Sequence, residues 1–125
     1  MKIRIKGNSI RFRLTKTEVQ LLAETGVVEE MTAFPNGDGF RYALTTSSTT
    51  ANDASFSEGK IAITLSKSWA EEWSNNEEVG TTFELETPSG ALAVLVEKDF
   101  NCLVVRENED ESDHFKNPLS EHPAC

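Results

Sequence analysis

The chain has 125 residues, of which 38% are hydrophobic, and its 12 basic and 21 acidic side chains give a formal net charge of −9. This length suits one folded domain, and the sequence contains neither the roughly 20 consecutive apolar residues of a membrane span nor an apolar leader, so we expect a cytoplasmic protein. Two cysteines, Cys102 and Cys125, are too few for a disulfide framework and are expected to be free thiols.

Positive charge is concentrated at the start of the chain. The first thirteen residues, MKIRIKGNSIRFR, contain no acid and five cations, which are Lys2, Arg4, Lys6, Arg11 and Arg13. Together with Lys16 these make half of the 12 basic residues, which leaves six basic against 21 acidic residues, a net charge of −15, for the rest of the chain. Such an acidic chain repels nucleic acid and anionic membranes at long range, so we expect neither as a partner.

The same segment predicts a β-hairpin. Cationic and apolar residues alternate on both sides of Gly7-Asn8, a pair typical of two-residue turns. This turn predicts the register Lys6–Ser9, Ile5–Ile10, Arg4–Arg11, Ile3–Phe12 and Lys2–Arg13. Like charges that lie opposite each other are destabilising. The basic side of the hairpin must therefore be solvated, neutralised by the chain's own acids, or bound to an anion, and Phe12, on the other side, offers it no stacking surface for bases.

A helix is predicted after the hairpin. Thr15 and Glu18 have the spacing of a capping box, Leu14 and Val19 that of a hydrophobic staple, and Gly26 ends the helix.

Strands are predicted next at residues 27–34 and 40–44, on either side of the turn-rich loop 35–39. The segment Thr45–Ser57, TTSSTTANDASFS, is low in hydrophobicity, and we expect it to be a solvated linker.

The order strand, helix, strand, strand then recurs. The second set consists of a strand at 60–65, a short helix with Trp69 and Trp73 capped by Ser66 or Ser68, and a hairpin of strands at 79–86 and 91–96. At an offset of 51 residues, Ile10, Phe12, Leu14 and Thr15 align with Ile61, Ile63, Leu65 and Ser66. These matches indicate half-repeats at residues 9–46 and 60–98.

The predicted fold is α+β: a mainly antiparallel sheet or open barrel with two short helices and a duplicated β-α-β-β unit, in a single domain at residues 1–106. The stretch at 91–96 is apolar on both faces, which is typical of a central strand. We expect Val19, Leu22, Trp69 and Trp73 to be the core residues of the helices.

Residues 107–125 are predicted to be an acidic, flexible tail. Five of the seven residues in Glu107–Asp113 are acids. Their sign leaves a second interpretation open, in which this run lies across the basic hairpin and neutralises it, although each exposed pair would contribute little.

Few residues indicate catalysis. Phosphate loops, nucleophile elbows and zinc-binding Cys-x-x-Cys pairs are missing from the sequence, and the two histidines, His114 and His122, lie in the tail. Whether these histidines bind metal with Cys125 stays open. Glu84 with Glu86, and Glu97 with Asp99, have a spacing that could hold Mg²⁺. In so acidic a chain we expect such pairs of carboxylates to occur by chance. Glu84 and Glu86 are expected to face solvent or to pair with Arg41 or the basic hairpin. We predict no metal and no cofactor.

The phrases MKIRIKGNSIR at Met1–Arg11 and VEKDFNCL at Val96–Leu103, with the acidic run Glu107–Asp113, resemble a family of small uncharacterised bacterial proteins. That resemblance implies no activity. The duplicated architecture is also similar to the triphosphate-tunnel fold, which implies inward-facing cations that hold polyphosphate. That family's first strand has glutamates for a metal, whereas this one has Lys2, Arg4 and Lys6, so we keep the likeness as architecture alone.

Three interpretations of function follow. The first is a monomeric, non-enzymatic interaction or structural protein, in which the basic hairpin pairs with the chain's own acids or with an unknown protein partner. The second is a binder of small anions or polyphosphate, or a phosphate-processing enzyme. The third, a nucleic-acid-binding ribbon, is disfavoured by the net charge. The candidate anion-binding residues are Lys2, Arg4, Lys6, Arg11 and Arg13.

Overall fold

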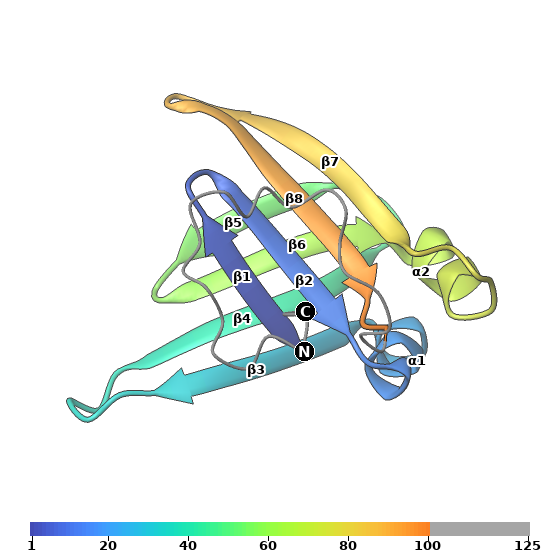
Figure 1. Ribbon diagram of the computed structural model, residues 1–125, viewed down its shortest axis with the longest axis horizontal. Coiled ribbons are helices and arrows are strands. Elements are labelled where there is room, and N and C mark those ends of the chain that lie inside the picture. The colour runs from blue at the N-terminus through green and yellow to red at the C-terminus, as the bar shows by residue number, and fades with distance from the viewer. Residues whose placement is uncertain (101–125) are drawn as a thin grey trace, which may run out of the picture.

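The computed structural model describes residues 1–100, which form eight strands and two helices. The strands are β1 (Lys2–Lys6), β2 (Ser9–Leu14), β3 (Val27–Ala33), β4 (Gly39–Ser47), β5 (Asp53–Ser57), β6 (Lys60–Ser66), β7 (Gly80–Thr87) and β8 (Gly90–Lys98), and the helices are α1 (Lys16–Thr25) and α2 (Lys67–Trp73). The strands make two four-stranded sheets, sheet A with the order β1-β2-β8-β7 and sheet B with the order β3-β4-β6-β5 (Figure 1).

The N-terminal hairpin has the predicted register, from Lys2 opposite Arg13 to Lys6 opposite Ser9. Gly7 adopts φ 54° in the turn, a left-handed conformation that favours glycine. Asn8 fixes the turn to the neighbouring strand: its Nδ2 donates to the carbonyl of Ala91 at 2.7 Å, and its own carbonyl accepts from the amide of Ala93 at 3.0 Å. The hairpin is therefore attached to β8 at its turn as well as along β2.

Both helices begin at the predicted caps. Thr15 and Glu18 form the capping box of α1, which ends at Gly26 with φ 80° and a hydrogen bond of 2.9 Å from the Gly26 amide to the carbonyl of Leu22. The hydroxyl of Ser66 accepts from the amide of Trp69 at the start of α2. No helix within residues 1–100 is long and apolar enough to cross a bilayer.

The two halves of residues 1–100 have the same order of elements, β-β-α-β-β, which contains one strand more than the expected unit. Adding 51 to the bounds of β1 gives those of β5, and adding 51 to the bounds of β4 gives those of β8. The prediction of a linker at Thr45–Ser57 is wrong, because β4 continues to Ser47 and β5 begins at Asp53. β5 is stabilised by its antiparallel pairing with β6. The sequence of β5 does not show the hydrophobic pattern of a strand clearly, because it has only two apolar residues, Ala54 and Phe56.

The halves exchange hairpins. Sheet A joins β1 and β2 of the first half to β7 and β8 of the second, and sheet B joins β3 and β4 to β5 and β6. At the centre of each sheet the two halves meet in a parallel pair, β2 with β8 and β4 with β6, while every other pair is antiparallel. The α+β class is confirmed. The sheets remain two separate layers that cross in Figure 1, and they do not close into a barrel.

One hydrophobic core lies between the two sheets and extends under the helices, which sit together at one end (Figure 1). Phe12 and Val96 of sheet A and Leu44 and Ile63 of sheet B are fully buried. Trp73 of α2 is also fully buried and donates its indole N–H to the carbonyl of Glu78 at 2.8 Å. The other predicted helix residues, Val19 and Leu22, are buried as well, whereas Trp69 is partly exposed and stacks on Trp73.

Gly80, the first residue of β7, lies directly against the backbone of β8, and a Cβ placed there would meet the carbonyl oxygen of Val96 at 1.9 Å. We therefore expect Gly80→Ala to force the strands apart and to lower the free energy of unfolding by about 1–3 kcal/mol, the range typical of overpacking. Thr82→Ala, on the exposed side of the same strand, is the matched control and should change it by less than about 0.5 kcal/mol. Equal denaturation midpoints for the two variants would contradict this account of the β7–β8 contact.

Candidate functional site

The five N-terminal cations lie together on the outer surface of sheet A. Strand alternation turns the apolar residues of the hairpin towards the core, where Phe12 is fully buried, and turns the cations away from it. The β1 side chains are exposed, and the β2 side chains are half-buried. We call this set the basic face: Lys2, Arg4, Lys6, Arg11 and Arg13. The likeness to a triphosphate tunnel is therefore wrong as architecture, because the cations point outwards from an open sheet.

Acids from the end of β8 neutralise part of the basic face. The parallel register places Glu97 opposite Arg13, two residue pairs beyond Arg11 and on the same side of the sheet, and a Glu97 carboxylate oxygen forms an ion pair with Arg11 Nε. Asp99 Oδ2 lies 3.0 Å from Lys2 Nζ, and the backbone amide of Asp99 donates to the carbonyl of Leu14 at 2.8 Å. Glu97 and Asp99 thus act as internal counter-ions, which is a different role from the magnesium pair considered from sequence.

Two cations of the basic face, Lys6 and Arg13, make no ion pair with any acid in residues 1–100. Lys6 stands at the hairpin turn and Arg13 at the far end of β2, so they mark the two ends of the face. The like-charge contacts of the hairpin, Arg4 with Arg11 and Lys2 with Arg13, are consequently balanced only in part by Glu97 and Asp99.

A shallow depression of about 300 Å³ lies within the basic face, and Lys2, Arg4, Arg11 and Arg13 contribute to its lining with Ile3. Guanidinium groups bind carboxylate and phosphate oxygens in a bidentate way, and lysine ammonium groups add a mobile point charge. The depression is therefore suited to a small number of carboxylate or phosphate groups.

The start of β1 is held by charges that the sequence analysis did not identify. The Met1 amino group forms ion pairs with Glu18 and, at 3.0 Å, with Glu30, and Tyr42 donates to Glu30 at 3.3 Å. Burial disfavours the charged amino group, but hydrogen bonds to both carboxylates outweigh it and raise its pKa above the ordinary 8.0. Burial likewise opposes the charge of Glu18, while bonds from the amino group and Thr15 lower its pKa. Burial and the nearby Glu30 raise the pKa of Tyr42.

Glu84 and Glu86 lie far from these cations. They occupy the exposed outer side of β7, the opposite edge of sheet A, which is about 14 Å from β1 at the usual strand spacing. Arg41 is on sheet B and does not meet them. Of the roles considered for these glutamates, the structure fits that of solvent-facing residues. Within residues 1–100 no group of three or more His, Cys, Asp or Glu side chains is arranged to hold a metal ion.

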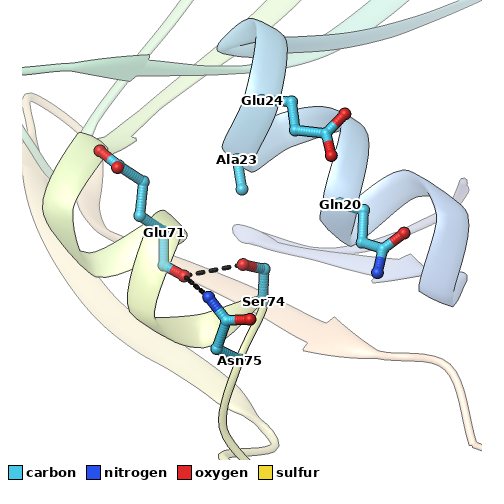
Figure 2. Close-up of a pocket in the computed structure, with 6 residues that line it drawn as sticks. All are labelled: Gln20, Ala23, Glu24, Glu71, Ser74 and Asn75. Carbon is cyan, nitrogen blue, oxygen red and sulfur yellow. Dashed lines mark hydrogen bonds between the residues drawn. The ribbon is translucent and has the colours of Figure 1, made fainter.

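The surface of residues 1–100 has other hollows besides the one in the basic face. A polar hollow of about 260 Å³ lies between α1 and α2, and in Figure 2 its Ser74 and Asn75 side chains both donate to the carbonyl of Glu71, at 2.7 and 3.2 Å. These two side chains thus satisfy a backbone carbonyl at the C-terminal end of α2. An apolar hollow of about 320 Å³ lies between the sheets beside Ile5 and Phe56, and no charged side chain lines it. A larger hollow of about 730 Å³ beside α1 is lined by charges of both signs, Lys16 and Lys98 with Glu77 and Asp99. The hollow in the basic face is distinguished from these by a lining whose charged side chains are all cations.

Several sequence-based predictions lie outside the described residues: the domain end at 106, the acidic tail at 107–125, the thiols Cys102 and Cys125, and the metal ligands considered at His114 and His122. Within residues 1–100, sequence reasoning predicted the hairpin register that puts the five cations on one side, but it missed the counter-ions Glu97 and Asp99. These two acids reach the basic face because β8 pairs in parallel with β2, which lies about 85 residues earlier in the chain. No local sequence pattern indicates a pairing over that distance. The repeat at offset 51 was the signal that could have indicated it.

Neutralising the internal counter-ion Glu97 should destabilise the hairpin, because Arg11 would then face Arg4 without compensation. We expect Glu97→Gln to lower the free energy of unfolding by about 1 kcal/mol at low ionic strength, and most of this loss should disappear in 1 M salt, where the screening length is only about 3 Å. Glu84→Gln, an exposed glutamate of the same sheet, should have almost no effect in urea denaturation. A loss of the same size at both salt concentrations would mean that Glu97 acts by packing.

The amino-terminal ion pairs predict a pH dependence. A raised pKa of the Met1 amino group means that its stabilising contribution is complete below pH 8.0 and is lost as the pH rises through the raised pKa. The lowered pKa of Glu18 means that the contribution of Glu18 is lost only as the pH falls below its ordinary value of 4.5.

Glu18→Gln tests this alkaline loss, because glutamine keeps the capping box and removes the charge. Calorimetry from pH 6 to 10 should show a smaller fall in melting temperature for this variant than for the native chain. Glu24→Gln, an exposed residue of the same helix, should keep the native slope. Identical slopes for all three chains would show that the amino group does not stabilise β1.

Comparison with known proteins relates the chain to one family. No curated protein and no solved structure matches it. A family model described as a family of unknown function (DUF7009) matches residues 1–119, nearly the whole chain, and its bounds include the basic hairpin and both sheets. The predicted membership of a family without a known activity is confirmed, while the bacterial origin stays a prediction. The chain belongs to the family of unknown function DUF7009.

Proposed function

We propose that the protein is a non-enzymatic interaction module and that the basic face binds an acidic segment of a protein partner. The observation that supports this most is the accumulation of five cations on one exposed surface of a chain whose net charge is −9. Such a surface is costly to fold, because like charges face each other in two cross-strand pairs of the hairpin. A surface that is maintained against this repulsion is best explained by an anionic group that it binds.

The shape of the face favours an extended acidic segment. Lys6 and Arg13 form no ion pair with an acid in residues 1–100 and stand at opposite ends of the hairpin, and the depression extends from Arg13 along the face as far as Arg4 and Arg11. Carboxylates spaced along a peptide could pair with both ends at once. Because the charged edge strand β1 discourages pairing between copies, we propose that the module acts as a monomer.

Small anions are the second candidate. Four of the five cations line a single depression of about 300 Å³, which is large enough for a short polyphosphate. In this alternative the arginines would hold phosphate oxygens in bidentate pairs.

The proposal is tested with a fluorescein-labelled hexaglutamate peptide and fluorescence anisotropy at low ionic strength. The double variant Lys6→Gln/Arg13→Gln should weaken peptide binding at least about fivefold, or roughly 1 kcal/mol. Arg41→Gln/Lys67→Gln is the matched control, since it removes one arginine and one lysine from exposed positions away from sheet A. It should weaken binding less than twofold.

Unlabelled tripolyphosphate added to the same titration separates the two candidates. Displacement of the peptide only at millimolar tripolyphosphate supports the acidic-segment proposal, whereas displacement at micromolar concentrations supports the small-anion alternative. Equal weakening by the two double variants would show that binding follows net charge and that the basic face is not the site.

A further inference from the structure

The acidic run Glu107–Asp113 is the strongest concentration of charge opposite in sign to the basic face, and it belongs to the same chain. We propose that this run is an intramolecular ligand of the basic face, so that an external acidic partner must displace it. This inference rests on the proposed function and adds a regulatory element to the same surface.

The path of the chain leads to the basic face. After β8 the backbone crosses the end of β2, where the amide of Asp99 donates to the carbonyl of Leu14 at 2.8 Å. The Asp99 carboxylate then lies 3.0 Å from the ammonium of Lys2, the first residue of β1. The last described residue, Phe100, therefore leaves the sheet at the corner of the basic face, next to one of its cations.

The length of the intervening chain is sufficient. Seven residue steps separate Phe100 from Glu107 and can span at most about 25 Å. The five residues of β1 extend over about 17 Å. The acidic run can consequently reach any position along the basic face, from Lys2 to Lys6.

The charges match in number and kind. The run contains Glu107, Glu109, Asp110, Glu111 and Asp113, five carboxylates for a face of five cations. Glu97 and Asp99 each form one ion pair there, with Arg11 and Lys2, so carboxylates of the run would compete for or add to these contacts. Individual exposed pairs are weak, but a short tether keeps the run at an effective concentration of about a millimolar, which favours several simultaneous pairs.

Occupation of the face by the run lowers its affinity for any other anion. The apparent dissociation constant rises in inverse proportion to the fraction of molecules in which the face is free. A face that is free in about a tenth of the molecules therefore binds an external peptide about tenfold more weakly. An external partner therefore needs a higher concentration, or more or better-placed acids, to displace the run.

The experiment compares two full-length variants with the same net charge. In the first, Glu107, Glu109 and Glu111 become Gln and Asp110 and Asp113 become Asn. In the second, five glutamates at the helix end become Gln: Glu24, Glu71, Glu72, Glu77 and Glu78, all exposed. Binding of the fluorescein-labelled hexaglutamate peptide is measured for both variants and for the native chain. In parallel, the native chain is treated with a zero-length carbodiimide reagent, and cross-links from Lys2 or Lys6 are mapped by mass spectrometry.

The expected result is about tenfold tighter peptide binding by the first variant, less than threefold by the second, and cross-links from Lys2 or Lys6 to the acidic run. Equal affinity gains in the two variants, without such cross-links, would overturn the inference while leaving the proposed function intact. Cross-links to the run with no peptide binding by any variant would support the intramolecular contact and refute the proposed external partner.

Discussion

The parallel pairing of β2 with β8 is the constraint on which the rest of the structure depends. It joins the first half of the chain to the second, and its counterpart, β4 with β6, does the same in the other sheet. Because each sheet contains one hairpin from each half, neither half can complete a sheet alone. The same pairing brings Glu97 to the cations of β2, so the link between the halves also determines the electrostatics of the basic face.

The electrostatic organisation explains how an acidic protein can keep a basic surface. At a net charge of −9 the long-range field repels polyanions such as nucleic acid. At short range, within a screening length of about 8 Å at physiological salt, the local cations dominate. On this basis we propose that a short acidic segment approaching the outer side of sheet A meets an attractive surface. The internal counter-ions Glu97 and Asp99 weaken this attraction at Arg11 and Lys2, with which they form ion pairs, and reduce the like-charge repulsion within the hairpin.

Locally encoded features could be predicted from the sequence, and long-range features could not. The hairpin register follows from Gly7-Asn8 and alternation, and the caps of α1 from Thr15, Glu18 and Gly26, all of which act within a few residues. The strand β5 was missed because it has no clear hydrophobic pattern of its own and is stabilised by pairing with β6. The hairpin exchange was missed because antiparallel neighbours are the usual outcome of consecutive strands, and parallel pairing needs distant contacts that no local residue encodes. The candidate cations were thus predicted, whereas their counter-ions and their position outside an open sheet were not.

The most direct measurement of the central claim, that the outer face of β1 and β2 binds acidic segments, is an NMR titration of the isotopically labelled full-length chain with hexaglutamate. The account predicts saturable shifts in the backbone amides of residues 2–13 and in the Nε–H signals of Arg4, Arg11 and Arg13, with helix signals unchanged. Shifts centred on α1 and α2, or shifts spread evenly over both sheets without saturation, would contradict it.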